Sequence, residues 1–298
     1  MLKPDLPQIM DKEGACLPAG LPLVVDAHVH IFPQGLFTAI WQWFDAHAWS
    51  IRYRLSTAGV FDFLLSHGIS HIVALQYAHK PGIAAALNRY MAAQCSEYQE
   101  KVTGMATIFP GEPDAVAILA EAFDMGLAGV KLHAHVQCFD MNGPEMDPIY
   151  ELCANVDKPM VMHVGREPKS PHYACDPYAI CRADKLERVI ENFPRLRVCV
   201  PHLGLDELSA YRHLIEAYDN LWLDTTMALA DYFPLPEDID LSHYRLERVM
   251  YGSDFPNIPY AWDRELKKLN QLNLSGLSDD ALAWIVHRSA AAFFNIHL

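Results

Sequence analysis

The chain has 298 residues, of which 51% are hydrophobic, and its 37 Asp and Glu against 23 Lys and Arg give a formal net charge of −14. It lacks the clustered Lys and Arg that neutralise nucleic-acid phosphates, and no apolar run approaches the roughly 20 residues that span a bilayer, which argues against both kinds of partner. The seven cysteines are scattered without a CxxC pair, as expected for reduced thiols in a cytoplasm.

Residues 1–20, "MLKPDLPQIMDKEGACLPAG", contain acids and prolines and no apolar segment of the kind found in signal peptides. We interpret them as an N-terminal arm that leads into the first strand. The remaining residues, 21–298, contain no low-complexity stretch and no linker. We therefore predict that they form one domain.

The first predicted strand is "VVDAHVHIFP", residues 24–33. Alternate side chains of a strand share a face, so Asp26, His28 and His30 would project together. Two imidazoles ~6–7 Å apart, twice the rise per residue, can converge on one cation. The alternative is a pair of core histidines that are hydrogen-bonded to carbonyl groups.

A long segment rich in aromatic residues follows, "FPQGLFTAIWQWFDAHAWSIRYRLS", residues 32–56. Loops longer than ~12–15 residues often act as lids over active sites. A helix that packs its aromatic side chains onto the rest of the domain explains the composition equally well. The sequence leaves both interpretations open.

Seven further β-type runs follow at 71–78, 102–110, 128–136, 159–167, 197–204, 221–229 and 249–257. Helical patterns separate many of them, at 82–99, 114–126, 183–193 and 206–218. Strand–helix alternation indicates parallel strands, and eight such strands in roughly 250 residues favour a closed (β/α)8 TIM barrel. A doubly wound open sheet is the rival, but it usually carries a glycine fingerprint after its first strand, where this chain has His-x-His.

Residues with ligand chemistry occur near the ends of five predicted strands: His28 and His30; Lys131, His133 and His135; His163; His202; and Asp254. Barrel enzymes place their chemistry at the C-terminal ends of strands, and zinc binds imidazole nitrogen and carboxylate oxygen. We therefore expect one divalent metal, bound by His28, His30, His163 and Asp254. Period two would place Lys131, His133 and His135 on one strand face, where His133 and His135 would meet substrate.

Five segments carry a family resemblance: "DAHVHIFP", "GVKLHAHVQ", "MHVGREP", "PHLG" and "YGSDFP". From about Leu23 onward the chain resembles the amidohydrolase superfamily, in particular its amidohydrolase-related branch with the aminocarboxymuconate-semialdehyde decarboxylase-like enzymes. The resemblance implies a (β/α)8 barrel with a divalent metal, usually zinc. It also implies the same four ligands, with His202 beside them as the acid–base residue.

The resemblance implies two reactions, hydrolysis and non-oxidative decarboxylation. We expect a hydrolase that uses a metal-activated water, with Asp254 accepting the water's proton and His202 assisting. The alternative is a metal-dependent decarboxylase of an aromatic or unsaturated carboxylic acid. A third alternative is a non-catalytic barrel that serves binding or scaffolding, but such a barrel would not need so many residues able to bind a metal. Zinc is the first expectation for the metal and manganese the second.

Lys131 has two interpretations. In two-metal relatives a carboxylated lysine on the fourth strand bridges the two ions. For Lys131 we favour the other interpretation, an unmodified lysine that lines the barrel beside a carboxylate. We expect Lys131 to contact the substrate.

The expected substrate is a small organic acid with an apolar or aromatic body. Cations are predicted on the side of the site mouth, at Arg52, Arg54, Lys80, Arg166 and Lys169, and would attract an anion. Arg166, three residues after His163, is predicted to clamp a carboxylate because its planar fork matches two oxygens. Assembly into a homo-oligomer stays open.

Overall fold

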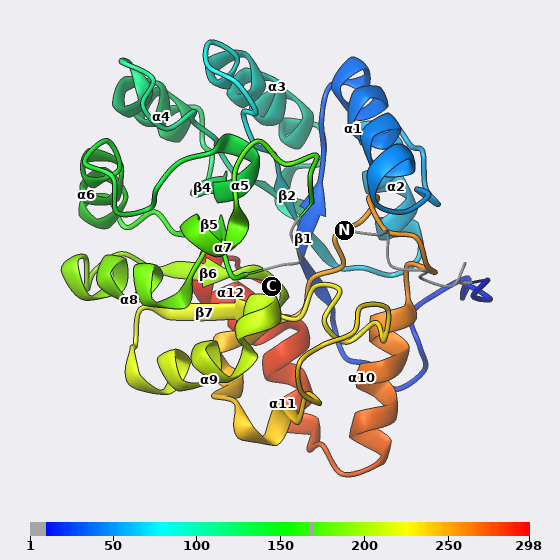
Figure 1. The fold of residues 1–298 in the computed structure, drawn as a ribbon. Helices are drawn as coiled ribbons and strands as arrows, with labels where there is room; N and C mark the ends of the chain where they lie inside the picture. Colours follow the sequence, from blue (N-terminus) through cyan, green and yellow to red (C-terminus); the bar gives the residue numbers. More distant parts are fainter. Residues whose placement is uncertain (1–9, 167–169) are drawn as a thin grey trace.

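A computed structural model describes residues 10–166 and 170–298. Its strands are β1 Val25–His30, β2 His71–Leu75, β3 Val102–Gly104, β4 Val130–His133, β5 Met160–His163, β6 Val198–Val200, β7 Leu221–Asp224 and β8 Val249–Met250. All pairings are parallel, in the orders β1-β2-β3 and β4-β5-β6-β7-β8. Figure 1 shows the strands that it labels, β1, β2 and β4 to β7, at the centre of the molecule.

Two short contacts join the two sheets into a barrel. Ala106 bridges to Val130 between β3 and β4, and Val29 of β1 bridges to Phe255, which follows β8. At the second junction Asp254 N donates to His28 O at 2.9 Å, and His30 N donates to Phe255 O at 2.8 Å. The predicted (β/α)8 TIM barrel is confirmed, and its β1–β8 junction, called the seam below, lies where candidate ligands meet.

Helices surround the strands (Figure 1). The longer ones are α1 Gln34–His47, α2 Thr57–Ser66, α3 Ala84–Ser96, α4 Ala115–Asp124, α6 Asp147–Asn155, α8 Ala183–Asn192, α9 Leu208–Ala217 and α10 Arg264–Leu274. The shorter ones are α5 Ala134–Gln137, α7 Pro177–Ile180, α11 Asp279–Ala283 and α12 Ser289–Phe294. The described chain also has short 3-10 and π turns, of which Pro201–Glu207 follows β6 directly.

The strands bury both faces, as parallel barrel strands do. Ile72 and Ala74 of β2 belong to a large cluster with helix side chains such as Leu119. The intervening residues of the strands, such as Val73, belong to a second cluster with Phe293 of α12. This alternation distributes the core between the helix layer and the barrel interior.

Residues 34–47, inside the aromatic segment, form helix α1, so the helix interpretation is confirmed there. Phe37 and Trp41 are buried, with ring centroids 4.9 Å apart. Trp43 stacks on Tyr173 of the loop after β5 at 5.8 Å. The helix thus packs its aromatic side chains both into the core and against a loop at the C-terminal ends of the strands.

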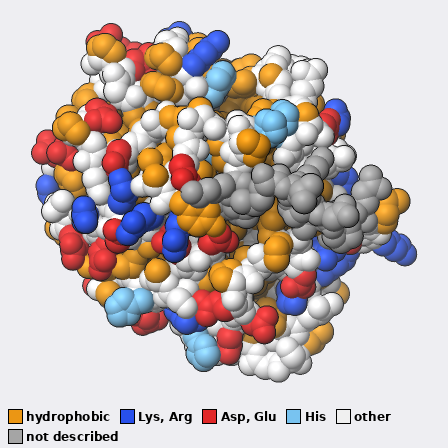
Figure 2. Space-filling model, in the orientation of Figure 1, with side chains coloured by type: hydrophobic (Ala, Val, Ile, Leu, Met, Phe, Trp, Pro, Cys, Tyr) orange, Lys and Arg blue, Asp and Glu red, His pale blue; other side chains and the backbone are white. Residues whose placement is uncertain are grey.

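The described part of the predicted arm packs against the barrel without forming a helix or strand. Gly14 N donates to the Asp263 carboxylate at 2.9 Å, and Leu17 N donates to His67 O at 3.0 Å. On the face shown in Figure 2, cationic and anionic side chains are interspersed. Among the described residues, no helix combines the length and apolar character that crossing a membrane requires.

Candidate active site

The first group of ligand-type side chains lies at the seam. His28 and His30 come from β1, and Asp254 follows β8; one ligand atom from each lies within 4.8 Å of the others. Asp254 Oδ1 is 3.0 Å from His30 Nε2 and 3.5 Å from His28 Nε2. We call these three residues the seam group. It brings together three of the four predicted metal ligands.

Backbone geometry at the end of β8 turns Asp254 toward β1. Asp254 adopts a left-handed φ of 64°, which is uncommon for a residue with a side chain. The preceding Ser253 is fixed to β1, since its hydroxyl donates to Asp26 Oδ2 at 2.6 Å and its N–H donates to Asp26 Oδ1 at 3.0 Å. Burial raises the pKa of Asp26 to about 7. Through these two hydrogen bonds Asp26 holds Ser253, the residue before Asp254, against β1 at the seam.

A buried carboxylate orients the first histidine. Asp224, the last residue of β7, accepts from His28 Nδ1 at 2.8 Å. A proton on Nδ1 leaves the lone pair on Nε2, which faces Asp254. Such a carboxylate partner is the usual support of a metal-ligating imidazole.

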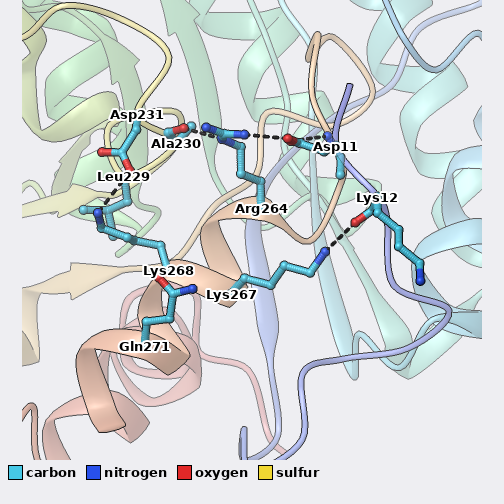
Figure 3. Close-up of a pocket in the computed structure, with 10 residues that line it drawn as sticks. Asp11, Lys12, Leu229, Ala230, Asp231, Arg264, Lys267, Lys268 and Gln271 are labelled. Atoms are coloured by element: carbon cyan, nitrogen blue, oxygen red, sulfur yellow. Dashed lines mark hydrogen bonds and ion pairs between the residues drawn. The ribbon is translucent and has the colours of Figure 1, made fainter. Parts of the chain in front are cut away.

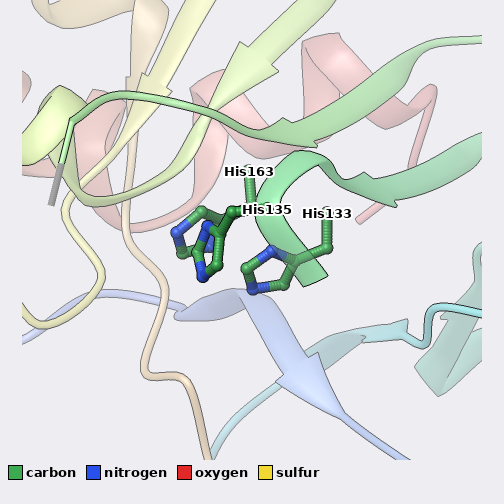
Figure 4. A group of neighbouring side chains, drawn as sticks. All are labelled: His133, His135 and His163. Carbon is green, nitrogen blue, oxygen red and sulfur yellow. The ribbon is translucent and has the colours of Figure 1, made fainter. Parts of the chain in front are cut away.

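The second group consists of His133, which ends β4, His135 in α5 and His163, which ends β5. One ring nitrogen from each lies within 4.8 Å of the others, and Figure 4 shows the three rings gathered together. His133 and His163 are stacked, with centroids 3.9 Å apart and planes 11° apart. We call these three residues the imidazole group. The structure thus gathers His163 with the strand-four histidines.

The prediction that Lys131, His133 and His135 share one strand face is wrong for His135. The strand ends at His133, because Gln137 turns back and its Oε1 accepts from His133 N at 2.8 Å. The Gln137 amide also donates to Ala78 O and Ile108 O at 2.9 and 2.8 Å. His135 therefore reaches the group from a helical turn.

His202 connects the two groups. It follows β6 with a left-handed φ of 59°, and its N–H donates to Asp224 Oδ1 at 3.0 Å. Its Nδ1 is 2.8 Å from Thr226 O, and its Nε2 is 3.2 Å from His163 Nδ1. Since the Thr226 carbonyl can only accept, His202 Nδ1 carries a proton and Nε2 is the nitrogen that exchanges one.

With this geometry in view, a family model described as Amidohydrolase matches residues 25–296. The chain belongs to the amidohydrolase family. It is an enzyme of the amidohydrolase superfamily, as its resemblance in sequence implied.

Individual relatives of this amidohydrolase are distant. The decarboxylase orsB of Emericella nidulans is 21% identical, with 93% of this chain and 98% of that protein covered. A TIM-barrel protein of Bordetella bronchiseptica has a TM-score of 0.71 at 19% identity, covering 92% and 99% of the two chains. The 5-carboxyvanillate decarboxylase of Novosphingobium aromaticivorans, solved with manganese and 4-hydroxy-3-methoxy-5-nitrobenzoic acid, has a TM-score of 0.65 at 15% identity, covering 96% and 99%. The structural matches establish the fold alone.

Lys131 of the amidohydrolase points toward the seam group, although it lies on β4. Its side chain is fully buried, and Nζ is 3.4 Å from His28 Nε2. Burial lowers the pKa of Lys131 to about 8, while the charges of Asp224 and Asp254 oppose this shift. The lysine thus lines the barrel within reach of the charges of two carboxylates, and the choice between its two interpretations stays a prediction.

The charge state of the seam group suits metal binding. Burial, and next the charge of Lys131, hold the pKa of His28 well below its usual range, so its lone pair is retained at neutral pH. For Asp254, burial opposes ionisation, but the hydrogen bond and charge of His30 outweigh it and lower the pKa of the carboxyl. Two neutral imidazoles and one carboxylate form a donor set that zinc and manganese both accept.

Arg166 lies in the loop after β5 and is partly exposed. Its Nε is 3.2 Å from Glu207 Oε1, and its guanidinium lies 5.4 Å from the Tyr178 ring. Arg52 and Arg54 pair with Glu13 and Asp45. Lys169 falls outside the described residues. Whether Arg166 holds a carboxylate of the substrate stays a prediction.

A separate cavity of about 250 Å³ lies between the arm and α10, lined by Asp11, Lys12, Leu229, Ala230, Asp231, Ala261, Arg264, Lys267, Lys268 and Gln271. Figure 3 shows that several of its cations are paired. Arg264 pairs with Asp11 at 2.7 Å, and Lys268 pairs with Asp231 at 3.0 Å. The cavity shares no residue with the seam or imidazole group.

Sequence reasoning missed Asp224 and Gln137, which position histidines of the two groups. A signal for Asp224 was present, since "LWLDTT" ends an apolar strand with an acid at the catalytic end of a barrel. Gln137 carried no comparable signal, because its role depends on the turn after His133. Tyr77 was missed as well; its ring contacts both His30 and His133, at 5.8 and 5.0 Å.

Proposed function

We propose that this amidohydrolase is a metal-dependent, non-oxidative decarboxylase of an aromatic or unsaturated carboxylic acid. The proposal depends mainly on the buried seam group, in which two imidazoles and a carboxylate meet at the catalytic end of the barrel beside Lys131. Similarity to the decarboxylase orsB over nearly the whole chain supports this reaction rather than the hydrolysis that the sequence first suggested.

The surroundings of the seam group favour a flat anion. Lys131 supplies a buried amine within 3.4 Å of His28, and an anion gains more from such a group in a site shielded from water. Phe32 and Tyr77 pack beside His30 with ring centroids at 6.0 and 5.8 Å. Basic groups next to aromatic faces suit a carboxylate attached to a ring.

We propose His28, His30 and Asp254 as metal ligands, with His163 as the predicted fourth. When bound, a divalent metal would supply Lewis-acid chemistry that neutralises substrate charge. Zinc fits the imidazole donors, and manganese is equally compatible with the carboxylate. Manganese gains support from its presence in the 5-carboxyvanillate decarboxylase structure.

The residues of the chain can complete the reaction. Decarboxylation breaks the bond between the carboxylate group and the substrate carbon that carries it, and releases carbon dioxide. The bonding electrons stay on the substrate carbon, which must then take up a proton. The Nδ1 proton of His202 is held by Thr226 O, so the proton that reaches the carbon is a second one, which the ring takes up from water at Nε2 and then delivers.

Hydrolysis is the second candidate function, favoured by the lowered pKa of Asp254. A carboxylate that stays ionised can accept the proton of an attacking water. Ester, lactone or amide substrates would then replace carboxylic acids, with the same ligands and His202 as proton donor to the leaving group.

The deciding experiment measures carbon dioxide release from a panel of hydroxylated benzoates and unsaturated acids, alongside hydrolysis of matched esters and lactones. We expect carbon dioxide release that a strong chelator abolishes and added zinc or manganese restores. His202→Asn is the active-site control, and His213→Ala, at an exposed position of α9, is the surface control. Hydrolysis without carbon dioxide release would replace the proposal with the second candidate, and full activity in chelator would exclude a catalytic metal.

We also propose that the enzyme acts in the cytoplasm on a small molecule, without nucleic-acid or membrane partners. The net charge of −14 and the absence of basic runs from the sequence argue against nucleic-acid binding, and the scattered cysteines without a CxxC pair support the cytoplasm.

A further inference from the structure

Two cysteines at the catalytic end of the barrel have no role in the proposed reaction. Cys138 directly follows α5 and is exposed, and Cys175, in the loop after β5, is partly exposed. Cys95, Cys153 and Cys199 are buried by contrast, and packing accounts for such thiols. A thiol that solvent reaches is open to oxidation instead.

The two cysteines meet at one backbone oxygen. Cys138 Sγ donates to His135 O at 3.4 Å, and Cys175 Sγ donates to the same atom at 3.1 Å. Two sulfurs that share one acceptor lie close to each other, and the Cys138 thiol is within hydrogen-bonding reach of Cys175. The fold thus brings together thiols from two separate loops.

The backbone at Cys138 is unusual for a residue with a side chain. Cys138 ends α5 in the left-handed region, with a φ of 54° and a ψ of 47°. Glycine and asparagine adopt this conformation more readily, and strained positions of this kind often serve function. Since glycine would relieve the backbone here, the thiol itself is the feature that needs an explanation.

The two thiols differ in reactivity. Cys138 is exposed, so a small oxidant reaches its sulfur from solvent. At Cys175, burial and next the neighbouring Cys138 thiol raise the pKa to about 12, so this sulfur stays protonated at neutral pH and reacts slowly on its own. An accessible cysteine beside a second cysteine that resolves its oxidised form is common in redox-sensing proteins.

We propose that Cys138 and Cys175 form a reversible disulfide when the protein meets hydrogen peroxide. The Cys138 sulfur attacks one peroxide oxygen, which breaks the O–O bond, releases water and leaves a sulfenic acid. The Cys175 sulfur then attacks the Cys138 sulfur, which breaks the S–O bond and releases a second water as the S–S bond forms. The two thiols give up two electrons and two protons, and hydrogen peroxide accepts them to become two waters.

The positions of both cysteines leave room for the movement that the bond requires. An S–S bond is about 2.0 Å long, so the two side chains must rotate toward each other. Cys138 lies just after α5 and Cys175 just before α7, and both lie outside the barrel strands. Tyr173, close to Cys175 in the sequence, contacts the His135 ring at 4.6 Å. The disulfide would therefore fix this part of the loop against α5, beside the imidazole group.

Such a pair is compatible with the cytoplasm proposed above. Thiols are kept reduced there, and the disulfides that do form are usually transient and redox-sensing. A pair that closes under peroxide and reopens with a thiol reductant agrees with the reduced cysteines that the sequence predicts. Formation of the bond does not depend on which reaction the enzyme catalyses.

The test is peptide mapping of the full-length protein as purified, before and after treatment with hydrogen peroxide. Free thiols are blocked with N-ethylmaleimide, the protein is digested with trypsin, and linked peptides are located by mass spectrometry without reduction. We expect a link between Cys138 and Cys175 that peroxide creates and dithiothreitol removes. Fragment spectra must distinguish this link from one at Cys153 or Cys181, which lie in the same tryptic peptides.

Serine variants separate the roles of the two thiols. Cys175→Ser removes the resolving thiol, so sulfenic acid should accumulate on Cys138 and be trapped by dimedone. Cys138→Ser should leave Cys175 a free thiol, because that sulfur is partly buried and protonated. Cys16→Ser is the matched control, since Cys16 is exposed on the N-terminal arm; it should form the link as the wild type does.

Three results would overturn the disulfide. Wild-type protein that keeps both thiols free under peroxide excludes it. A link from Cys138 or Cys175 to another cysteine assigns a different partner. Separate oxidation of the two sulfurs, without a link, would show that they do not approach each other.

Discussion

The seam group and the imidazole group present the same ring on strands that are not adjacent in the barrel, and they orient it by different means. In the seam group, Asp224 holds the His28 ring itself at Nδ1. In the imidazole group, Gln137 holds the backbone of His133, while Nδ1 of that ring has no partner among the described residues. The first arrangement sets the tautomer of a ligand, and the second sets only its position. We therefore expect metal binding that depends on the basicity of the imidazole ring to occur at the seam group.

Replacing Asp254 should produce the largest effect. Asp254→Ala removes the carboxylate from the seam group, so we expect loss of manganese binding and a roughly 10²–10⁴-fold fall in turnover, the range for removal of a catalytic acid or base. Measured turnover and metal content check both parts. Near-normal turnover in Asp254→Ala would move the catalytic centre to the imidazole group.

His202 lies between the groups and tests their division of labour. His202→Asn should lower turnover at least ~100-fold, because the group that transfers the proton is lost, while metal content stays unchanged. Steady-state kinetics and elemental analysis of the same preparation give the answer. If metal is lost as well, His202 is a ligand.

The support of the His28 ring is tested at Asp224. Asp224→Asn should weaken metal binding at the seam about 10–100-fold, as for other carboxylates that support ligating histidines. Metal affinity is read from chelator competition.

The matched variant Gln137→Met should leave that affinity unchanged and lower the free energy of unfolding by about 1–3 kcal/mol, because buried backbone groups lose their partner. Equal effects of the two variants on affinity would remove the distinction between the groups.

Lys131 should make stability depend on pH in the metal-free protein. Its folded pKa of about 8 lies below the ordinary 10.5, so between these values the unfolded chain binds more protons and stability rises with pH. Urea unfolding of wild type and Lys131→Met at pH 7.5 and 10 should differ in this rise by roughly 1–3 kcal/mol. A parallel response of both proteins would show that the lysine is not titrated in this window.

The smallest effect is expected at Arg166, in the loop that follows the strand ending with His163. Arg166→Ala should raise KM for carboxylate substrates by roughly 5–10-fold, since the guanidinium is partly exposed and screened by water, and leave KM for neutral analogues nearly unchanged. Equal changes for both substrate types would make Arg166 an anchor for Glu207 instead of a carboxylate clamp.

Much of the seam group could be predicted because it depends on rules that act along a strand. Alternation in "VVDAHVHIFP" placed His28 and His30 on one face, and the barrel rule brought Asp254 to the same end. The imidazole group was less accessible, since the strand stops at His133 and a helical turn brings His135 back. That stop depends on a hydrogen bond from His133 N to Gln137, and local patterns do not encode such a bond.

The strand lengths were overestimated for the same reason. The expected run 249–257 contains only two strand residues, and the expected run 197–204 contains three. Beyond each, the chain leaves the sheet through left-handed residues, at His202 and Asp254. Apolar side chains continue past the strand ends because the barrel mouth is also buried, so hydrophobicity alone could not mark where pairing stops.

The seam also sets the order in which the two groups can come into being during synthesis. All three residues of the imidazole group have been synthesised once the chain reaches His163, whereas the seam group waits for Asp254, 91 residues later, and for the first strand to meet the last. A ribosome-bound chain can therefore gather its imidazole group while the His28–His30 pair still lacks its carboxylate. Capture of a metal by the seam group would then report that the barrel has closed.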